Sequence, residues 1–472
     1  MKEPIHKLLI ILIVALLILG GLSFIPWSTI SGGKLHDYNL LSDILISSPD
    51  SLEKETPEEE NDMDPELLKI MLNDSAKNEV KEYMAPGYMD SVETPSTSII
   101  PDSVKIQPIK EGDLVVLEDY TVTQQGLRYL KTAIGSGTLA RIGVIGDSYI
   151  EGDIMVQNLR EMLQDRFGGN GVGYMNLYSD FPGFRQSVRQ GGKGWEVHDF
   201  KKGKKNYIGV MQHYFTPEGN ATASYKGVNK FGHLDKWDNS RFLFISPENA
   251  VIKTRVGGNN EWVLHNITGS TDVQEIYLSS LTDRFEIETS SPGIIGLGVW
   301  LDGNNGISVD CMSSRGFSGI SLADIDESLT SKLSQFISYD LIILEFGINA
   351  MSAKQKDYSV YGRRMDRVIE KIKKVYPSAD ILLMGVGDRG QKIGGEVHSM
   401  PTVRNMIDTQ RSVAMRNNVL FWDTREAMGG EDAVVQWNRN GLVNKDYVHL
   451  SHKGGQKLAE PLFNAIINSL SK

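Results

Sequence analysis

The sequence predicts an α/β protein with a doubly wound, three-layer parallel sheet that is interrupted by an inserted all-β sandwich. Two observations support this fold class. Short apolar runs alternate with helical patterns over residues 105–170 and 306–472, which is typical of β-α-β units with right-handed crossovers. Residues 171–305 instead carry short alternating runs separated by glycine and asparagine, which favours a β-sandwich or jelly roll.

The apolar periodicity places each element of the two α/β segments. We expect helices at 122–133, 154–163, 358–375, 402–416 and 454–470, and strands at 142–145, 307–312, 341–344, 381–384 and 419–422. In the inserted block we expect strands at 207–212, 241–245, 261–267, 275–278, 284–289 and 294–301. The block thus interrupts one α/β domain between its first helix after Ser148 and its second strand.

Composition excludes several classes of protein. The formal net charge of the 472 residues is −11, but residues 50–66 hold nine acidic residues and one lysine, which leaves about −3 for the remainder. No basic field for nucleic acid is present. A single cysteine, Cys311, excludes an intrachain disulfide framework and a cysteine-rich zinc site. The histidines of the inserted block lack ligand spacing, so we predict no metal and no cofactor. They are His198, His213, His233 and His265.

The amino-terminal segment predicts a membrane anchor. Residues 8–27 are uncharged and mostly aliphatic, long enough to cross a bilayer as a helix. Lys2 and Lys7 favour a cytoplasmic amino terminus. A cleaved signal peptide is the rival interpretation, but the run exceeds a usual signal core and lacks an Ala-x-Ala site. We therefore expect residues 1–27 to anchor the chain in the inner membrane, with an exported, periplasmic remainder.

Residues 28–104 form an expected linker between this anchor and the globular part. Their composition is acidic and rich in serine and proline, so the segment cannot bury enough apolar area to order itself. Within it, the amphipathic piece 65–72 could be a transient helix or a docking segment.

Ser148 is the candidate nucleophile. It follows the strand expected at 142–145 in a Gly-Asp-Ser sequence and precedes a helical pattern. A strand-to-helix turn lies at the carboxyl edge of a parallel sheet, where open α/β folds place their sites. The tripeptide alone is also an ordinary turn and N-cap sequence. Nucleophilic serine chemistry needs in addition a base, a group that orients the base, and donors for the oxyanion.

Residues of each kind follow later predicted strands. Gly319 lies in the loop after the second strand and can bring a backbone N–H close to a ligand, while Asn349 follows the third strand. Asp446 and His449 precede the last helix, and their spacing lets the carboxylate bind one imidazole nitrogen while the other faces a hydroxyl. His452 is the chief competitor of His449; we interpret it as a capping residue of the last helix.

Together, Gly-Asp-Ser, the block-two glycine, Gly-x-Asn and Asp-x-x-His resemble the four blocks of the SGNH (GDSL-type) hydrolases, over about residues 105–166 and 305–472. The resemblance implies that Ser148 is the nucleophile, His449 the general base and Asp446 its orienting partner. It also implies an oxyanion hole made by the Ser148 and Gly319 backbone N–H groups and the Asn349 side chain. Gly316 remains an alternative to Gly319.

A narrower likeness is carried by residues 146–153, 167–174 and 427–430 with Trp437, which resemble exported bacterial peptidoglycan O-acetylesterases with a carbohydrate-binding β-insertion. It implies a serine esterase that removes O-acetyl groups from a cell-wall or other polysaccharide through an acyl-enzyme. An O-acetyltransferase for the same class of glycan, and a non-catalytic, membrane-tethered glycan-binding protein, are the alternatives. Four tryptophans of the insertion are candidates for stacking on sugar, although packing is the commoner role. They are Trp195, Trp237, Trp262 and Trp300.

Overall fold

The computed structural model describes residues 67, 69, 114–258 and 260–471. The expected anchor at 1–27 lies outside the described residues, as does the expected linker except for Leu67 and Lys69. Leu67 is helical and fully buried in the apolar core, so this part of the amphipathic piece docks. Among the described residues, no helix has the length and apolarity needed to cross a membrane.

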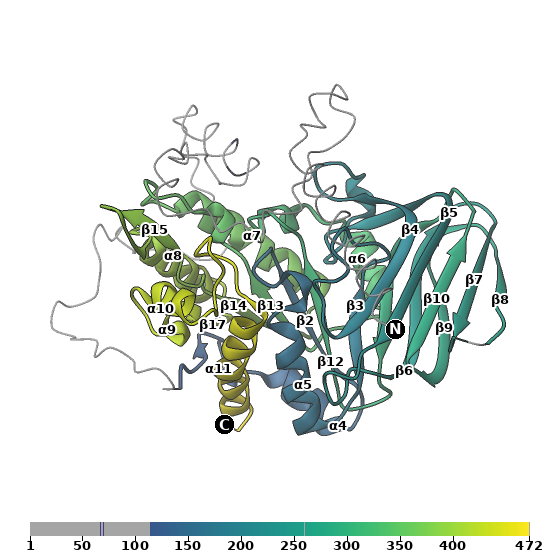
Figure 1. The fold of residues 1–472 in the computed structure, drawn as a ribbon, viewed down its shortest axis with the longest axis horizontal. Coiled ribbons are helices and arrows are strands. Elements are labelled where there is room, and N and C mark those ends of the chain that lie inside the picture. The colour runs from purple at the N-terminus through teal and green to yellow at the C-terminus, as the bar shows by residue number, and fades with distance from the viewer. Residues whose placement is uncertain (1–66, 68, 70–113, 259, 472) are drawn as a thin grey trace, which may run out of the picture. The chain divides into compact units, whose positions relative to one another are not determined.

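A six-stranded sheet organises the α/β domain (Figure 1). Its order is β1-β17-β14-β13-β2-β12, and every pairing is parallel except that of β1 with β17. Counted along the chain, the five parallel strands have the order 2-1-3-4-5, one of the common doubly wound arrangements. The strands are β1 (Glu118–Asp119), β2 (Ala140–Gly146), β12 (Ile307–Ser313), β13 (Leu341–Glu345), β14 (Asp380–Met384) and β17 (Leu420–Trp422).

Helices cover both faces of this sheet, which confirms the predicted three layers. Ile142 and Val144 of β2 lie in one apolar core with α4, α5 and α11, while the next residue, Ile145, lies in the other core with α6, α7 and α8. This alternation follows from the two-residue period of a strand. The helices are α4 (Arg128–Ser136), α5 (Val156–Phe167), α6 (Glu327–Leu333), α7 (Ser359–Val375), α8 (Val403–Arg416), α9 (Thr424–Met428), α10 (Ala433–Arg439) and α11 (His452–Leu470).

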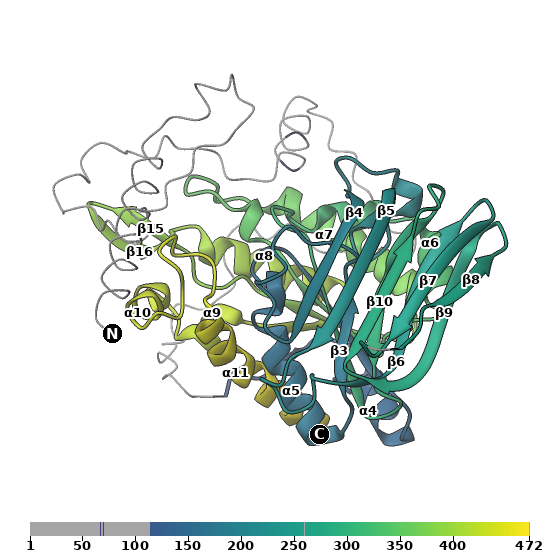
Figure 2. The ribbon, with the colours of Figure 1, turned by 45° about the vertical axis from the view of Figure 1, so that its right-hand side comes forward.

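The predicted all-β insertion is confirmed, and it lies between α5 and β12 (Figure 2). Its nine strands are antiparallel. The long strand β5 pairs with β11 through Phe215 and with β10 through residues 221–226, so one strand passes from one part of the sheet to another and curls it around a third core. The strands are β3 (Gly171–Met175), β4 (Val188–His198), β5 (Tyr214–Gly227), β6 (Trp237–Ser246), β7 (Ala250–Val256), β8 (Val263–Ile267), β9 (Ser270–Thr282), β10 (Arg284–Thr289) and β11 (Ile295–Asp302).

Some expected elements differ from the structure. The strand expected at 207–212 is wrong: a 3₁₀ turn at Lys205–Tyr207 leads into a further turn. The alternating apolar residues Ile208 and Val210 instead pack into the core beside β12 and α6. The helix expected at 122–133 begins six residues later, at Arg128. The short helices α6, α9 and α10 were not expected, nor was the hairpin of β15 (Gly390–Ile393) and β16 (Glu396–Ser399).

A buried charge cluster joins the insertion to the sheet. Arg141 of β2 lies 2.7 Å from Asp302 of β11 and 3.1 Å from Asp310 of β12. Asp310 also accepts a hydrogen bond from the Trp300 indole N–H at 3.0 Å. Buried charges are tolerated when they are paired and hydrogen-bonded in this way. Removing one partner would leave an uncompensated charge, so the cluster fastens the insertion to the sheet near the amino-terminal end of β2.

Candidate active site

Ser148 lies just beyond the carboxyl end of β2, in the turn that leads to α5. Gly146 is the last residue of β2, and only glycine fits there because a Cβ atom would lie 2.7 Å from the Glu345 carbonyl oxygen of β13. The Ser148 side chain is nearly enclosed, with the residue 7% exposed. Its Oγ lies 2.8 Å from Nε2 of His449, although 300 residues separate them in sequence. The fold thus brings the candidate nucleophile and the candidate base into hydrogen-bond contact.

The loop before α11 orients the His449 ring. Nδ1 of His449 lies 2.9 Å from an Asp446 carboxylate oxygen, and the other Asp446 oxygen accepts the backbone N–H groups of Val448 and His449. Partial burial acts to raise the pKa of Asp446, but these hydrogen bonds outweigh it and lower the pKa to about 2. An ionised Asp446 accepts the Nδ1 proton, which leaves Nε2 to accept the Ser148 hydroxyl proton.

His452 does not take part in this chain of hydrogen bonds. It is the first residue of α11, and its ring lies 5.9 Å from the ring of Phe184. Our interpretation of His452 as the helix cap is wrong, because Ser451 is the N-cap and its side chain accepts the N–H of Gly454. A hydroxyl suits this position because it accepts an unpaired backbone N–H of the first helical turn.

Gly319 and Gly316 occupy different environments. Both have a left-handed backbone, with φ of 88° and 75°. At Gly319 a Cβ atom would lie 2.5 Å from the Phe346 ring, whereas at Gly316 a Cβ atom would meet nothing within 4 Å. Only Gly319 is therefore closed to a side chain by its surroundings, which favours it as the position where the backbone must stay accessible. Its place in an oxyanion hole stays a prediction.

Asn349 lies in the 3₁₀ turn Ile348–Ala350, directly after β13. Its Nδ2 donates to Asp147 Oδ2 at 2.9 Å and to the Phe317 carbonyl at 3.0 Å. These contacts use both amide hydrogens, so an oxyanion would have to replace one of them. In this structure Asn349 links the residue before the nucleophile to the loop that carries Gly319, and its oxyanion role also stays a prediction.

Two buried carboxyl groups, Asp147 and Glu345, lie behind the nucleophile and were missed at the sequence level. Burial raises the pKa of Glu345 well above its usual range, the nearby Asp147 carboxylate raises it further, and the Asp147 backbone N–H opposes the shift. Burial also raises the pKa of Asp147, against hydrogen bonds from the Tyr149 N–H and the Asn349 amide. Two adjacent carboxyls in a dry site resist double ionisation, so Glu345 stays protonated. The sequence did offer a signal for Glu345, because this acid directly follows the apolar run expected to be a buried strand at 341–344.

Replacing Glu345 with glutamine should stabilise the protein increasingly as pH rises. The folded wild type holds a proton at Glu345 that the unfolded chain releases above about pH 4.3. Its free energy of unfolding therefore falls with pH, by up to about 1.4 kcal/mol per unit, whereas Glu345→Gln lacks this loss. Thermal unfolding at about pH 5 and about pH 8 measures the difference in Tm between variant and wild type, which should widen at the higher pH.

Glu327→Gln is the matched control for this pH dependence. Hydrogen bonds and charges from Lys371 and Lys374 lower the pKa of Glu327 to about 2, so it is ionised in both states over that pH range. Its Tm difference from the wild type should stay constant. A constant difference for Glu345→Gln as well would contradict a buried, protonated Glu345.

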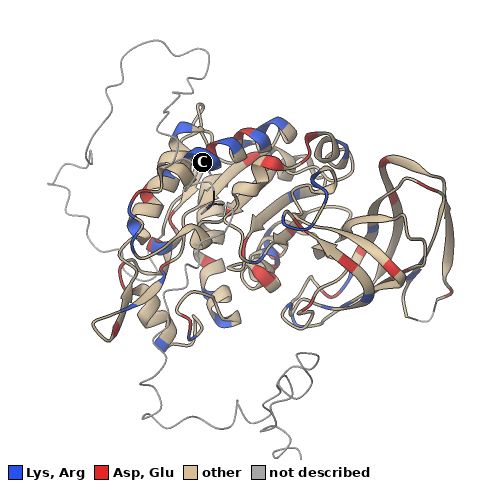
Figure 3. Ribbon diagram, turned by 90° about the horizontal axis from the view of Figure 1, so that it is seen from above, with Lys and Arg blue, Asp and Glu red and all other residues tan. Residues whose placement is uncertain are grey.

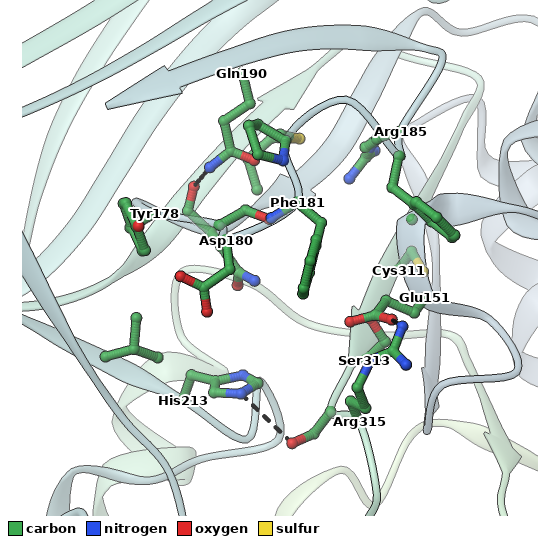
Figure 4. Close-up of a pocket in the computed structure, with 18 of the residues that line it drawn as sticks. Glu151, Tyr178, Asp180, Phe181, Arg185, Gln190, His213, Cys311, Ser313 and Arg315 are labelled. Carbon is green, nitrogen blue, oxygen red and sulfur yellow. Dashed lines mark hydrogen bonds and ion pairs between the residues drawn. The ribbon is translucent and has the colours of Figure 1, made fainter. Parts of the chain in front are cut away.

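A cavity of about 340 Å³ adjoins the site (Figure 4). Its wall includes Glu151 and Gly152, which follow Ser148 in sequence, the residues that follow β12, and the loop between β3 and β4. A second serine–histidine contact lies here, between Ser314 Oγ and His213 Nε2 at 3.4 Å. Nδ1 of His213 faces the Met211 carbonyl instead of a carboxylate, and burial lowers the pKa of His213. This pair therefore lacks the orienting acid that His449 has.

The described residues contain no cluster of three or more histidine, cysteine, aspartate or glutamate side chains that could hold a metal ion. Acidic and basic residues are interspersed along both domains (Figure 3), as on an ordinary solvated surface.

Comparison with protein families adds to this geometry. Residues 279–457 match the GDSL-like Lipase/Acylhydrolase family, a stretch that includes Gly319, Asn349, Asp446 and His449. The match leaves out Ser148, whose place beside His449 comes from the fold. No curated protein matches the sequence.

Comparison with solved structures also finds a shared fold. A structure described as a peptidoglycan O-acetylesterase is 23% identical, with a TM-score of 0.63, and the match covers 75% of this chain and 99% of that chain. A family two carbohydrate esterase from Cellvibrio japonicus is 11% identical, with a TM-score of 0.27 and coverage of 60% and 99%. The likeness to the first of these structures extends over the α/β domain and the insertion, and it shows a common fold.

The tryptophans that we considered for sugar stacking mostly serve packing. Trp195, Trp237 and Trp300 are buried, and only Trp262 is partly exposed, at 37%, where the Arg255 guanidinium lies 4.6 Å from its ring. Phe181 and Phe184 are instead the exposed aromatic residues that line the cavity. Sequence reasoning missed them because we considered only tryptophan in the insertion.

Proposed function

We propose that this protein is a serine esterase that removes O-acetyl groups from a polysaccharide, in the manner of a peptidoglycan O-acetylesterase. The observation that carries the proposal is the continuous chain from Ser148 Oγ to His449 Nε2 at 2.8 Å and from His449 Nδ1 to Asp446 at 2.9 Å. This is the arrangement that converts a weakly nucleophilic hydroxyl into an attacking group.

The first half-reaction acylates the serine. Ser148 Oγ attacks the acetyl carbonyl carbon while its proton passes to His449 Nε2, and Asp446 stabilises the imidazolium that forms. The oxyanion is expected to accept hydrogen bonds from the Ser148 and Gly319 backbone N–H groups. When the intermediate collapses, the bond to the sugar oxygen breaks, and His449 returns the proton to that oxygen. The acetyl group is then esterified to Ser148.

The second half-reaction releases acetate. His449 takes a proton from a water molecule, whose oxygen attacks the acetyl carbonyl carbon. The bond between that carbon and Ser148 Oγ breaks, and His449 protonates Oγ. Acetate leaves, and the resting state of the site is restored. A sugar hydroxyl in place of water would give acetyl transfer with the same residues.

Support for the substrate class comes from three sources: the match of residues 279–457 to the GDSL-like family, the shared fold with a protein described as a peptidoglycan O-acetylesterase, and the inserted β-domain beside the site. An esterase site next to a second domain suits a polymer that extends beyond the reacting ester. Anchoring and export of the chain, which we predicted from residues 1–27, would place such an enzyme near the cell wall.

Acetate release tests the proposed function. The purified wild-type protein should release acetate from O-acetylated peptidoglycan faster than from acetylated xylan, because of the likeness in fold. Enzymatic acetate assays on both polymers at matched ester concentration give the comparison. Faster release from xylan would contradict the assignment of peptidoglycan as the preferred glycan. Hydrolysis of p-nitrophenyl acetate without activity toward either polymer would contradict the polysaccharide substrate but not the esterase. A product dominated by newly acetylated glycan, when an acetyl donor is added, would favour acetyl transfer.

A further inference from the structure

The cavity beside the nucleophile is built partly by the insertion. Glu151, in its wall, donates its backbone N–H to the Ser148 carbonyl at 3.4 Å, so the wall begins within one turn of the nucleophile. From the other side, the loop between β3 and β4 contributes Phe181 and Phe184. A Cβ atom at Gly152 would lie 2.5 Å from the Phe184 ring, which shows how closely this loop covers the turn after Ser148.

A buried ion cluster holds this aromatic loop in place. Arg185, at the end of the loop, donates to the Val172 and Tyr174 carbonyls of β3 and lies 3.1 Å from Asp153. Asp153 is buried, has φ of 64° and also pairs with Arg160 of α5 at 2.6 Å. The loop is thereby fastened to the segment that carries the nucleophile.

Two phenyl rings of the fastened loop face solvent. Phe181 is 61% exposed and Phe184 is 40% exposed. Figure 4 shows the Phe181 ring projecting into the cavity, with Asp180 on one side of it and Glu151 and Arg315 on the other. The Arg315 guanidinium carbon lies 5.9 Å from the Phe181 ring centroid. An exposed aromatic ring on a fixed loop, beside a reactive group, is a ready contact surface for a ligand.

The charges of the cavity select among ligand classes. Glu151 pairs with Arg315 and Asp153 pairs with Arg185, so these four charges are largely balanced. The other charged residues of the wall are Asp180, Asp199 and Lys202. An anionic polymer would meet more acid than base here, and a long acyl chain would bury charged groups at a cost. A neutral sugar fits both features, because one face of the ring is apolar and its edge carries hydroxyl groups.

We propose that this cavity binds the sugar residues that flank the acetylated one in a polysaccharide substrate, with the Phe181 ring as the surface on which a sugar stacks. The inference rests on the proposed function, since it makes the cavity the neighbouring part of the same site. The volume of 340 Å³ lies within the range of about 300–1,000 Å³ typical of ligand pockets.

Substitution of Phe181 separates polymer binding from ester chemistry. Phe181→Ala should lower kcat/KM for the acetylated polysaccharide that the wild type deacetylates fastest by about tenfold, mainly through KM, because aromatic anchors carry much of a binding energy. Hydrolysis of p-nitrophenyl acetate, which carries no flanking sugar to occupy the cavity, should stay unchanged. Phe181→Leu keeps an apolar side chain without an aromatic face and should resemble the alanine variant, whereas Phe181→Trp should retain polymer activity. Trp262→Ala removes an exposed ring outside the cavity and should change neither activity.

The outcomes distinguish this inference from the proposed function. Unchanged polymer kinetics in Phe181→Ala would overturn the sugar-binding role, and so would equal losses on polymer and p-nitrophenyl acetate, because the ring would then support the nucleophile instead. A wild type that hydrolyses p-nitrophenyl acetate but neither polymer overturns the inference and leaves an esterase. A wild type that hydrolyses no ester overturns the proposed function itself. Calorimetric titration of Ser148→Ala with deacetylated peptidoglycan fragments gives a readout without catalysis, and the heat of binding should disappear in Ser148→Ala/Phe181→Ala.

Discussion

Ser148→Ala is expected to lower kcat for p-nitrophenyl acetate by about 10⁴-fold or more, since the reaction then lacks the atom that forms the acyl-enzyme. Ser148 Oγ is the hydroxyl that contacts His449, and the residue is almost enclosed, so a methyl group in its place should fit without disturbing the fold. Steady-state hydrolysis of p-nitrophenyl acetate measures the loss, and a thermal unfolding curve verifies that the variant is folded.

Ser314→Ala is the matched control, because the Ser314 hydroxyl also contacts a histidine, His213, at 3.4 Å. That histidine lacks a carboxylate partner on its other nitrogen, so Ser314→Ala should keep most of its activity on p-nitrophenyl acetate. If Ser314→Ala lost activity and Ser148→Ala kept it, the nucleophile would be assigned to the wrong serine.

His449→Ala should reduce the same activity by about 10⁴-fold, because removing the base leaves the Ser148 hydroxyl un-ionised at neutral pH. His449 is the residue that connects Ser148 to Asp446 through its two ring nitrogens. His452 lies three residues further along, on the first turn of α11, and makes neither contact. His452→Ala should therefore retain activity.

The two histidines are compared by measuring the rates of the burst and steady-state phases of p-nitrophenol release by purified His449→Ala and His452→Ala. A lower rate of the burst in His449→Ala would place the histidine in acylation. Equal activities of His449→Ala and His452→Ala would remove the base from the proposed mechanism.

Much of the α/β domain could be predicted because its elements carry strong periodic patterns. The run that ends at Ile145 places apolar side chains on both faces of the sheet, and every residue of β2 is buried. A parallel strand that helices cover on both sides requires this pattern. The helix expected at 358–375 agrees with α7 to within one residue. Short helices such as α10 could not be predicted, because they contain too few residues for a helical period to stand out.

The candidate site was predictable where its residues follow strands in sequence. Ser148, Asn349 and the Asp446–His449 pair each stand next to a strand or before the last helix, and the parallel topology gathers them at one edge. The partners of Asn349 could not be predicted, since its contact with Asp147 depends on the close approach of β2 and β13. The exposure of Phe181 likewise depends on how the insertion packs against the sheet.

Covalent labelling by diethyl p-nitrophenyl phosphate tests the central claim most directly. An activated serine attacks the phosphorus atom, expels p-nitrophenolate and keeps a stable diethylphosphoryl group. We predict one such group, located by peptide mass spectrometry on the peptide that contains Ser148, with much slower labelling in His449→Ala and none at that position in Ser148→Ala. Labelling of a different residue in the wild type, or equal labelling of Ser148→Ala, would contradict the account.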